Sequence, residues 1–151
     1  MNAAMLTHVP PKVLERIASG KQRYLFKRTT PRRDFQRVEV FTDMKNPRVK
    51  MELHPGEMQS GTVEEIRSLF FRFSGMQPNE WASLFFGCKT ATAIEILNHQ
   101  TVLEQEQFNP VHYWRLNQPP QQYCYVPFPP WPLGCPQTRA QCPADELQLT
   151  V

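Results

Sequence analysis

Ten residues near the amino end, SGKQRYLFKR at positions 19–28, combine four cations with two aromatic rings. The basic character continues, because seven Lys or Arg side chains fall between residues 21 and 37 and Asp34 is the one acid among them. Clustered cations neutralise the phosphates of a nucleic acid, and aromatic rings stack on unpaired bases. The alternative is a solvated strand and loop without a ligand. We favour a binding site for a polyanion.

The distribution of charge along the chain supports this interpretation. Residues 1–50 hold 12 of the 17 Lys and Arg against 4 of the 14 Asp and Glu, which leaves a balance of +8. Residues 51–151 hold the other 5 cations and 10 acids, a balance of −5. Charge acts through its place on the surface, so this asymmetry matters more than the net charge of +3. It predicts one basic region on an otherwise mildly acidic protein.

Length and composition predict a single globular domain. The chain has 151 residues, 40% of them hydrophobic, which is enough to enclose one core. Four cysteines are too few for a disulfide scaffold, and neither a signal peptide nor a long apolar span is evident. We therefore expect a soluble protein of the reducing cytoplasm.

The first half of the chain predicts one short helix followed by strands. Pro11 suits a first helical turn, and Gly20 can end the helix in the left-handed conformation. The helix is expected at 10–19 and the strands at 24–27, 37–41 and 48–53. HPGEMQSG, residues 54–61, reads as a loop.

The second half predicts two helices, a strand and an extended piece. Thr62 and Glu65 form a capping box, after which Ile66, Leu69, Phe70 and Phe73 make one apolar face. A further helix is expected from Pro78 to Gly87, a strand at 91–97 and an extended segment at 118–126. Nine of the 15 prolines lie between Pro110 and Pro143, so residues 127–151 are predicted to be a Pro-rich tail.

This order of elements predicts an α+β domain with a strongly curved sheet or small barrel. Four stretches carry a family resemblance: SGKQRYLFKR, the later SG that precedes a helix ending in FFGC, ATAIEIL and PPQQYCYV. In this order they resemble the ASCH-domain family of the PUA-like superfamily, over residues 8–126. The resemblance implies a small PUA-like β-barrel with flanking helices and a cleft that binds RNA or a nucleotide-like ligand.

The family stretch has the form G-x-K-x-x-E-x-R, and this chain departs from it. Gly20 matches, but Gln22 stands in place of Lys, Leu25 in place of Glu or Thr, and Lys27 in place of Arg. Some ASCH proteins act on modified nucleosides or cleave RNA, and Gln and Leu cannot titrate near neutral pH. The departures favour binding over hydrolysis, and we assign no catalytic residue.

The candidate ligand-binding residues combine the basic stretch with tyrosines that could flank the cleft. They are Lys21, Gln22, Arg23, Tyr24, Lys27, Arg28, Arg32, Arg33, Tyr123 and Tyr125. The cations would hold phosphates, whereas Gln22 and Tyr24 would face a base or sugar. The expected partner is RNA or a nucleotide, and the sequence leaves the oligomeric state open.

Other classes of function remain as alternatives. A hydrolase of modified nucleosides (an amidohydrolase) or of RNA (a ribonuclease) would need a titratable residue in the cleft. An adaptor protein would use PFPPWP, residues 127–132, as a polyproline ligand. A metal site is not expected, because Cys124, Cys135 and Cys142 are spaced by eleven and seven residues. No cofactor is implied.

Overall fold

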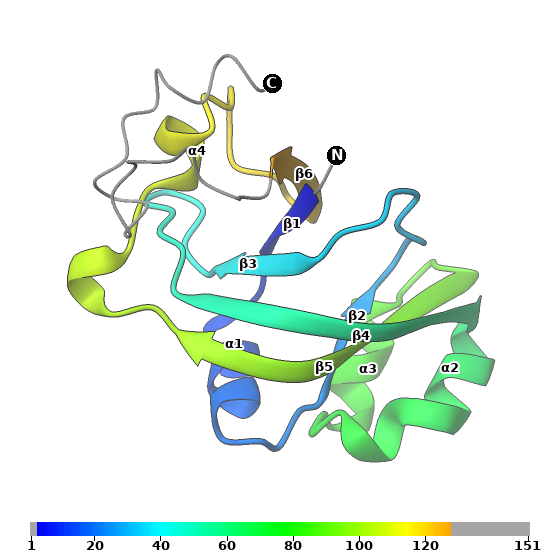
Figure 1. Ribbon diagram of the computed structural model, residues 1–151. Coiled ribbons are helices and arrows are strands. Elements are labelled where there is room, and N and C mark those ends of the chain that lie inside the picture. The colour runs from blue at the N-terminus through cyan, green and yellow to red at the C-terminus, as the bar shows by residue number, and fades with distance from the viewer. Residues whose placement is uncertain (1–2, 128–151) are drawn as a thin grey trace.

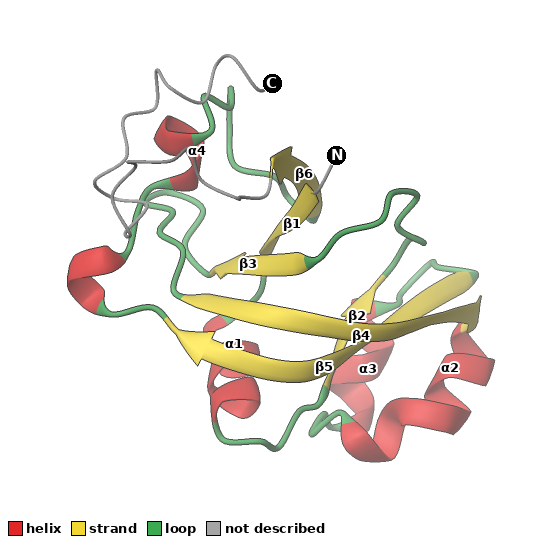
Figure 2. Ribbon diagram, in the orientation of Figure 1, coloured by secondary structure: helices red, strands yellow, loops and turns green. Residues whose placement is uncertain are grey.

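Six strands and four α-helices make up the part of the chain that the structure, a computed structural model, describes, residues 3–127 (Figures 1 and 2). The Pro-rich tail expected at 127–151, with the adaptor motif, lies outside the described residues from Phe128 on. The strands are β1 (Ala3–His8), β2 (Tyr24–Lys27), β3 (Arg37–Phe41), β4 (Met51–Thr62), β5 (Thr90–Thr101) and β6 (Tyr123–Pro127). The helices are α1 (Pro11–Ala18), α2 (Val63–Phe70), α3 (Pro78–Leu84) and α4 (Pro110–Tyr113), with short 3₁₀ turns η1 (Phe71–Phe73) and η2 (Glu104–Glu106).

The strands form one sheet in the order β2-β5-β4-β3-β1-β6, which confirms the α+β class. The predicted barrel is wrong, because the sheet is open: β2 lies at one edge, β6 at the other, and they do not pair. Side chains join the β2 end of the sheet to the β1–β6 end instead. The amine of Lys27 on β2 donates to Thr7 Oγ1 on β1, and the hydroxyls of Thr29 and Tyr123 lie 2.9 Å apart.

The strand β1 was not predicted from the sequence. It lies between β3, which it pairs in parallel, and β6, which it pairs in antiparallel fashion. Four of its residues, from Ala3 to Leu6, are at most 2% exposed. This strand precedes residue 8, where we expected the domain to begin, and it brings the two ends of the described chain together (Figure 1).

The loop expected at 54–61 is instead the second half of β4, so that prediction is wrong. Strand β4 pairs with β5 along its whole length, with register shifts at His54/Pro55 and Pro55/Met58. The bulge accommodates the proline, which cannot donate a ladder hydrogen bond. A Cβ at Gly56 would lie 2.1 Å from Glu95 Oε1, so a larger residue there would displace the Glu95 side chain.

The helices follow the predicted signals closely. Helix α1 ends as expected at Gly20, whose φ is +79°. At α2 the N-cap half of the capping box is confirmed, because Glu65 N donates to Thr62 Oγ1 at 3.1 Å, whereas the Glu65 carboxylate accepts from the Thr62 hydroxyl. The predicted apolar face of α2 is only partly buried, because Ile66 is buried, whereas Leu69 and Phe73 are 45% and 40% exposed.

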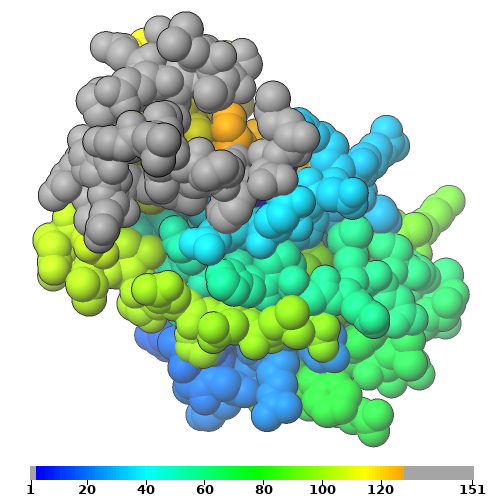
Figure 3. All heavy atoms as spheres, in the orientation of Figure 1, coloured from blue at the N-terminus to red at the C-terminus, as the bar shows by residue number. Residues whose placement is uncertain are grey.

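The core consists of three clusters of buried side chains. Helix α1 packs through Val13 and Ile17 against the sheet, beneath which it lies in Figure 1. Helices α2 and α3 pack around Trp81 at the β2 and β5 end, and α4 packs beside β1 and β6 at the other. Strands β4 and β5 remain uncovered across the face in Figure 3. Among the described residues, no helix has the length and apolar character needed to cross a membrane.

Candidate functional site

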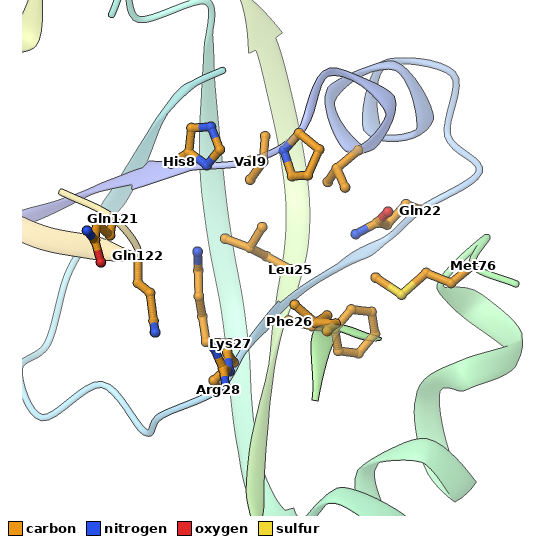
Figure 4. A pocket seen from close by; sticks show the side chains of 13 residues that line it. His8, Val9, Gln22, Leu25, Phe26, Lys27, Arg28, Met76, Gln121 and Gln122 are labelled. Carbon is orange, nitrogen blue, oxygen red and sulfur yellow. The ribbon is translucent and has the colours of Figure 1, made fainter. Parts of the chain in front are cut away.

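A cavity of about 240 Å³ lies where the two edges of the sheet approach one another. Residues of β1 and its flank form one wall, residues 22–28 form the opposite wall, and residues 121–122, just before β6, close one side. The barrel would have closed at this position. The open sheet therefore leaves space that side chains line (Figure 4).

The cavity joins an apolar floor to a polar side. The floor lies where two clusters of buried side chains meet. The cluster around α1 contributes Val9, Val13 and Leu25, and the cluster around Trp81 contributes Phe26 and Met76. The polar side chains are His8, Gln22, Lys27, Arg28, Gln121 and Gln122. Three amides, an imidazole and two cations can hydrogen-bond a polar heterocycle or sugar.

The side chain of Lys27 extends into the cavity, between Gln122 and Leu25 and toward His8 (Figure 4). Its exposed fraction is 6%, and its amine donates to Thr7 Oγ1. The Tyr123 ring centroid lies 5.9 Å from Nζ. Strand alternation explains the placement, because Leu25 and Lys27 of β2 point to the same face and line the same cavity.

Burial lowers the pKa of Lys27 from its ordinary 10.5 to about 7. The physical cause is desolvation, which penalises the charged ammonium. A hydroxyl and an aromatic face offset this penalty far less than a carboxylate would. The cavity therefore contains an amine that titrates near neutral pH.

Gln22 is fixed by a chain of polar contacts from α3. Arg16 and Glu80 form a two-pronged ion pair with N–O distances of 3.0 and 2.5 Å, and Arg16 Nε donates to Gln22 Oε1 at 3.0 Å. Gln22 Nε2 in turn donates to Tyr24 O at 2.9 Å. These bonds hold a 2% exposed amide at the cavity wall. Arg16 is therefore a positioning residue.

The tyrosines of β6 contact the segment 28–36, which follows β2. The backbone N–H groups of Arg32 and Arg33 donate to Tyr125 Oη at 3.1 and 3.2 Å, and the Arg33 guanidinium lies 5.1 Å from the Tyr125 ring centroid. Arg28 Nε donates to Cys88 Sγ at 3.0 Å, and Nη2 donates to Phe86 O at 3.2 Å. The tyrosines thus organise a basic loop.

The structure brings three of the ten predicted residues to the cavity, namely Gln22, Lys27 and Arg28. Lys21, Arg23, Arg32 and Arg33 are exposed residues outside its lining, and Tyr123 and Tyr125 contact the 28–36 segment. Tyr24 packs on Phe70, with ring centroids 4.7 Å apart. The seven cations therefore do not all converge on one hollow.

Sequence reasoning missed His8, Gln121 and Gln122. His8 Nε2 lies 3.0 Å from Thr42 O, and because a carbonyl can only accept, Nε2 is the donor. Gln122 O accepts from Thr7 Oγ1 at 2.6 Å. The one signal in the sequence was the QPPQQYCYV stretch, which contains both glutamines. Within residues 3–127 no three metal-ligating side chains gather.

The open curved sheet and its helices have the fold of the ASCH class of proteins. Crystal structures of ASCH from Zymomonas mobilis and of two ZmASCH mutant proteins match with TM-scores of 0.69, 0.68 and 0.70 and identities of 20%, 20% and 21%. Each match covers 82% of this chain and 87–90% of the other. No protein-family model and no curated protein matches the chain.

At these identities the likeness establishes the fold. The resemblance to ASCH-domain proteins predicted from the sequence is thereby confirmed at the level of the fold. The likeness assigns no ligand, so the function of the cavity must be argued from its own residues.

Proposed function

We propose that this cavity binds one nucleotide unit, either free or within single-stranded RNA. The observation that carries the proposal is that Gln22, Lys27 and Arg28 of the basic stretch meet His8, Gln121 and Gln122 across an apolar floor. Amide groups hydrogen-bond the edges of a base, and an apolar floor packs against its face. A cation at the wall can contact the attached phosphate.

The volume of the cavity limits the size of the ligand. At about 240 Å³ it falls below the roughly 300 Å³ at which pockets for drug-sized ligands begin. One heterocycle, with its sugar toward the opening, suits this space better than a stacked pair of bases. A longer RNA would leave its other nucleotides outside.

The placement of the cations predicts a weak dependence on salt. For single strands, log K falls with log[salt] with a slope of about −0.7 for each phosphate contacted. One phosphate contact from each cavity cation, Lys27 and Arg28, predicts a slope of about −1.4, whereas engagement of all seven would give about −5. The slope therefore distinguishes a nucleotide pocket from an extended basic face.

The test is fluorescence polarisation of labelled single-stranded pentaribonucleotides with the full chain across a salt series. We expect saturable binding, a shallow slope and competition by one unlabelled nucleoside monophosphate. Arg28→Gln should weaken binding at least severalfold. Lys45→Gln, at an exposed position outside the cavity, is the matched control and should have no effect. Absence of binding at micromolar protein concentrations, or equal effects of the two variants, contradicts the proposal.

A second function, hydrolysis of a modified nucleoside or of RNA, gains support from Lys27. The sequence disfavoured hydrolysis because Gln22 and Leu25 cannot titrate near neutral pH, whereas Lys27, with its pKa lowered to about 7, is a titratable group in the cavity. An amine with a pKa of about 7 can act as a general base at physiological pH. Turnover of acylated cytidine or single-stranded RNA that Lys27→Arg abolishes would establish catalysis. Binding without turnover would leave the pocket a binding module.

A further inference from the structure

We propose that Lys27 is an imine-forming lysine, whose side-chain amine adds covalently to the carbonyl carbon of a small hydroxyaldehyde held in the cavity. This inference concerns the chemistry of one amine and does not depend on RNA binding. It starts from the hydrogen bonds and surroundings of Nζ.

No carboxylate among the described residues pairs with the Lys27 amine. The ion pairs of residues 3–127 join Lys12 and Arg16 to Glu80, and Arg37 to Glu52, so none of them includes Lys27. Its contacts are Thr7 Oγ1 and the Tyr123 ring, and its fellow lining groups His8 and Arg28 bring no negative charge. Among residues 3–127, no carboxylate pairs with the amine to hold it as an ammonium ion.

The hydrogen bonds of Thr7 fix the direction in which the Lys27 amine donates. Thr7 Oγ1 donates its proton to Gln122 O at 2.6 Å, so toward Lys27 it can only accept. One N–H of the amine is thereby fixed on Thr7. The remaining N–H and the lone pair of a neutral amine are free to face the cavity, into which the side chain extends (Figure 4).

The reaction balances without an additional reagent. The Nζ lone pair attacks the carbonyl carbon, the C=O π electrons move to oxygen, and a proton passes from nitrogen to oxygen to give a carbinolamine. Loss of that hydroxyl as water, with a second proton from nitrogen, forms the C=N bond. No electrons are exchanged, and water is the leaving group.

The lining of the cavity determines the class of aldehyde that fits it. The cavity places amide groups of Gln121 and Gln122 on the polar side and Leu25 and Val9 on the floor. Hydroxyl groups on the carbon chain of the aldehyde would hydrogen-bond to the amide donors and acceptors of these two glutamines. A short hydroxylated aldehyde, the class to which open-chain sugars belong, therefore suits the site.

The expected selectivity follows from the neutral fraction of each amine. With its pKa at about 7, half of Lys27 is neutral at pH 7, whereas an ordinary lysine at 10.5 is neutral in less than one molecule in a thousand. The lower basicity and the burial of Lys27 reduce its rate per neutral molecule. We expect a net preference of at least tenfold over exposed lysines.

The experiment uses glyceraldehyde with sodium cyanoborohydride, which reduces the imine to a stable amine, on the full-length protein between pH 6 and 9. Peptide mass spectrometry then compares the labelling rates of Lys27 and Lys21, an exposed lysine nearby. We expect Lys27 to lead at least tenfold at pH 7 and its rate to level off above pH 7. The rate at Lys21 should keep rising to pH 9.

Lys27→Arg keeps a cation at the position but cannot form an imine, so it should remove this adduct and leave Lys21 labelling unchanged. The site-resolved rates in the unaltered protein decide the question even if this variant does not fold. Labelling of Lys27 at or below the rate of Lys21, or a rate still rising at pH 9, overturns the proposal. RNA binding, measured separately, can fail or succeed without changing this result.

Discussion

The replacement Lys27→Met should change how stability depends on pH. Methionine has a similar length and no charge, so the variant lacks the amine that burial keeps from being protonated. On unfolding, Lys27 returns from a pKa of about 7 to 10.5, so between these values the unfolded chain binds more protons than the folded chain. The free energy of unfolding of the unaltered protein must therefore rise with pH through this window.

The size of the effect follows from the difference between the two pKa values. Each pKa unit corresponds to about 1.4 kcal/mol, so the full cost of burying the amine is about 5 kcal/mol below pH 7 and vanishes above 10.5. Between pH 7 and pH 9 it falls by about 2 kcal/mol. The stability advantage of Lys27→Met over the unaltered protein should shrink by that amount.

Urea unfolding of both proteins at pH 7, 8 and 9 measures this change, with the fluorescence of Trp81 and Trp114, 2% and 4% exposed, as the signal. Other groups that titrate in this window are common to both proteins and cancel in the difference. If that difference stays constant from pH 7 to 9, Lys27 keeps an ordinary pKa in the folded protein. Our account of the cavity would then be wrong.

Three further predictions concern other positions. Burial raises the pKa of Cys124 from 9.0 to about 11, so the contribution of the protonated thiol to stability is present below pH 9 and is lost as the pH rises to 11. Cys124→Ala should flatten this decline in the free energy of unfolding, measured by urea unfolding. An unchanged dependence of that free energy on pH would contradict the prediction. Thr62→Ala removes the cap of α2 and should lower the unfolding free energy by about 1 kcal/mol, whereas Thr62→Ser should restore most of it. Arg16→Met removes the two-pronged partner of Glu80, leaves it only the Lys12 amine at 3.9 Å and should cost about 2 kcal/mol; it should also weaken nucleotide binding through Gln22, and unaltered affinity would show that Gln22 needs no such support.

Local signals predicted the elements that contain their own start and stop residues. Helix α1 and the capping box of α2 depend on residues within one or two turns, so the sequence was sufficient for them. Strand β2 was predicted with Leu25 and Lys27 on the same face, and both line the cavity.

Features that depend on distant partners were missed or misread. Strand β1, AAMLTH, has no alternation or turn signal, because a central strand is buried on both faces. In β4, Pro55 and Gly56 read as a loop because the bulge and the approach of Glu95 are tertiary features. The cations were expected to act together, but residue spacing cannot show that Lys27 alone turns into the cavity, whereas Arg37 pairs with Glu52 and the others are exposed.

The hydrogen bond from Thr7 to Gln122 joins residues 115 positions apart, and the residue pairs of β1 and β6 are still farther apart in the sequence. During synthesis the wall formed by Gln122 cannot exist until nearly the whole described chain has left the ribosome. Until then, β1 exposes an unsatisfied edge, and contacts of such long sequence separation form slowly. A nascent or prematurely terminated chain would thus have most of the core and lack the cavity side formed by Gln121 and Gln122, so ligand binding that needs these amides would report completed translation through β6.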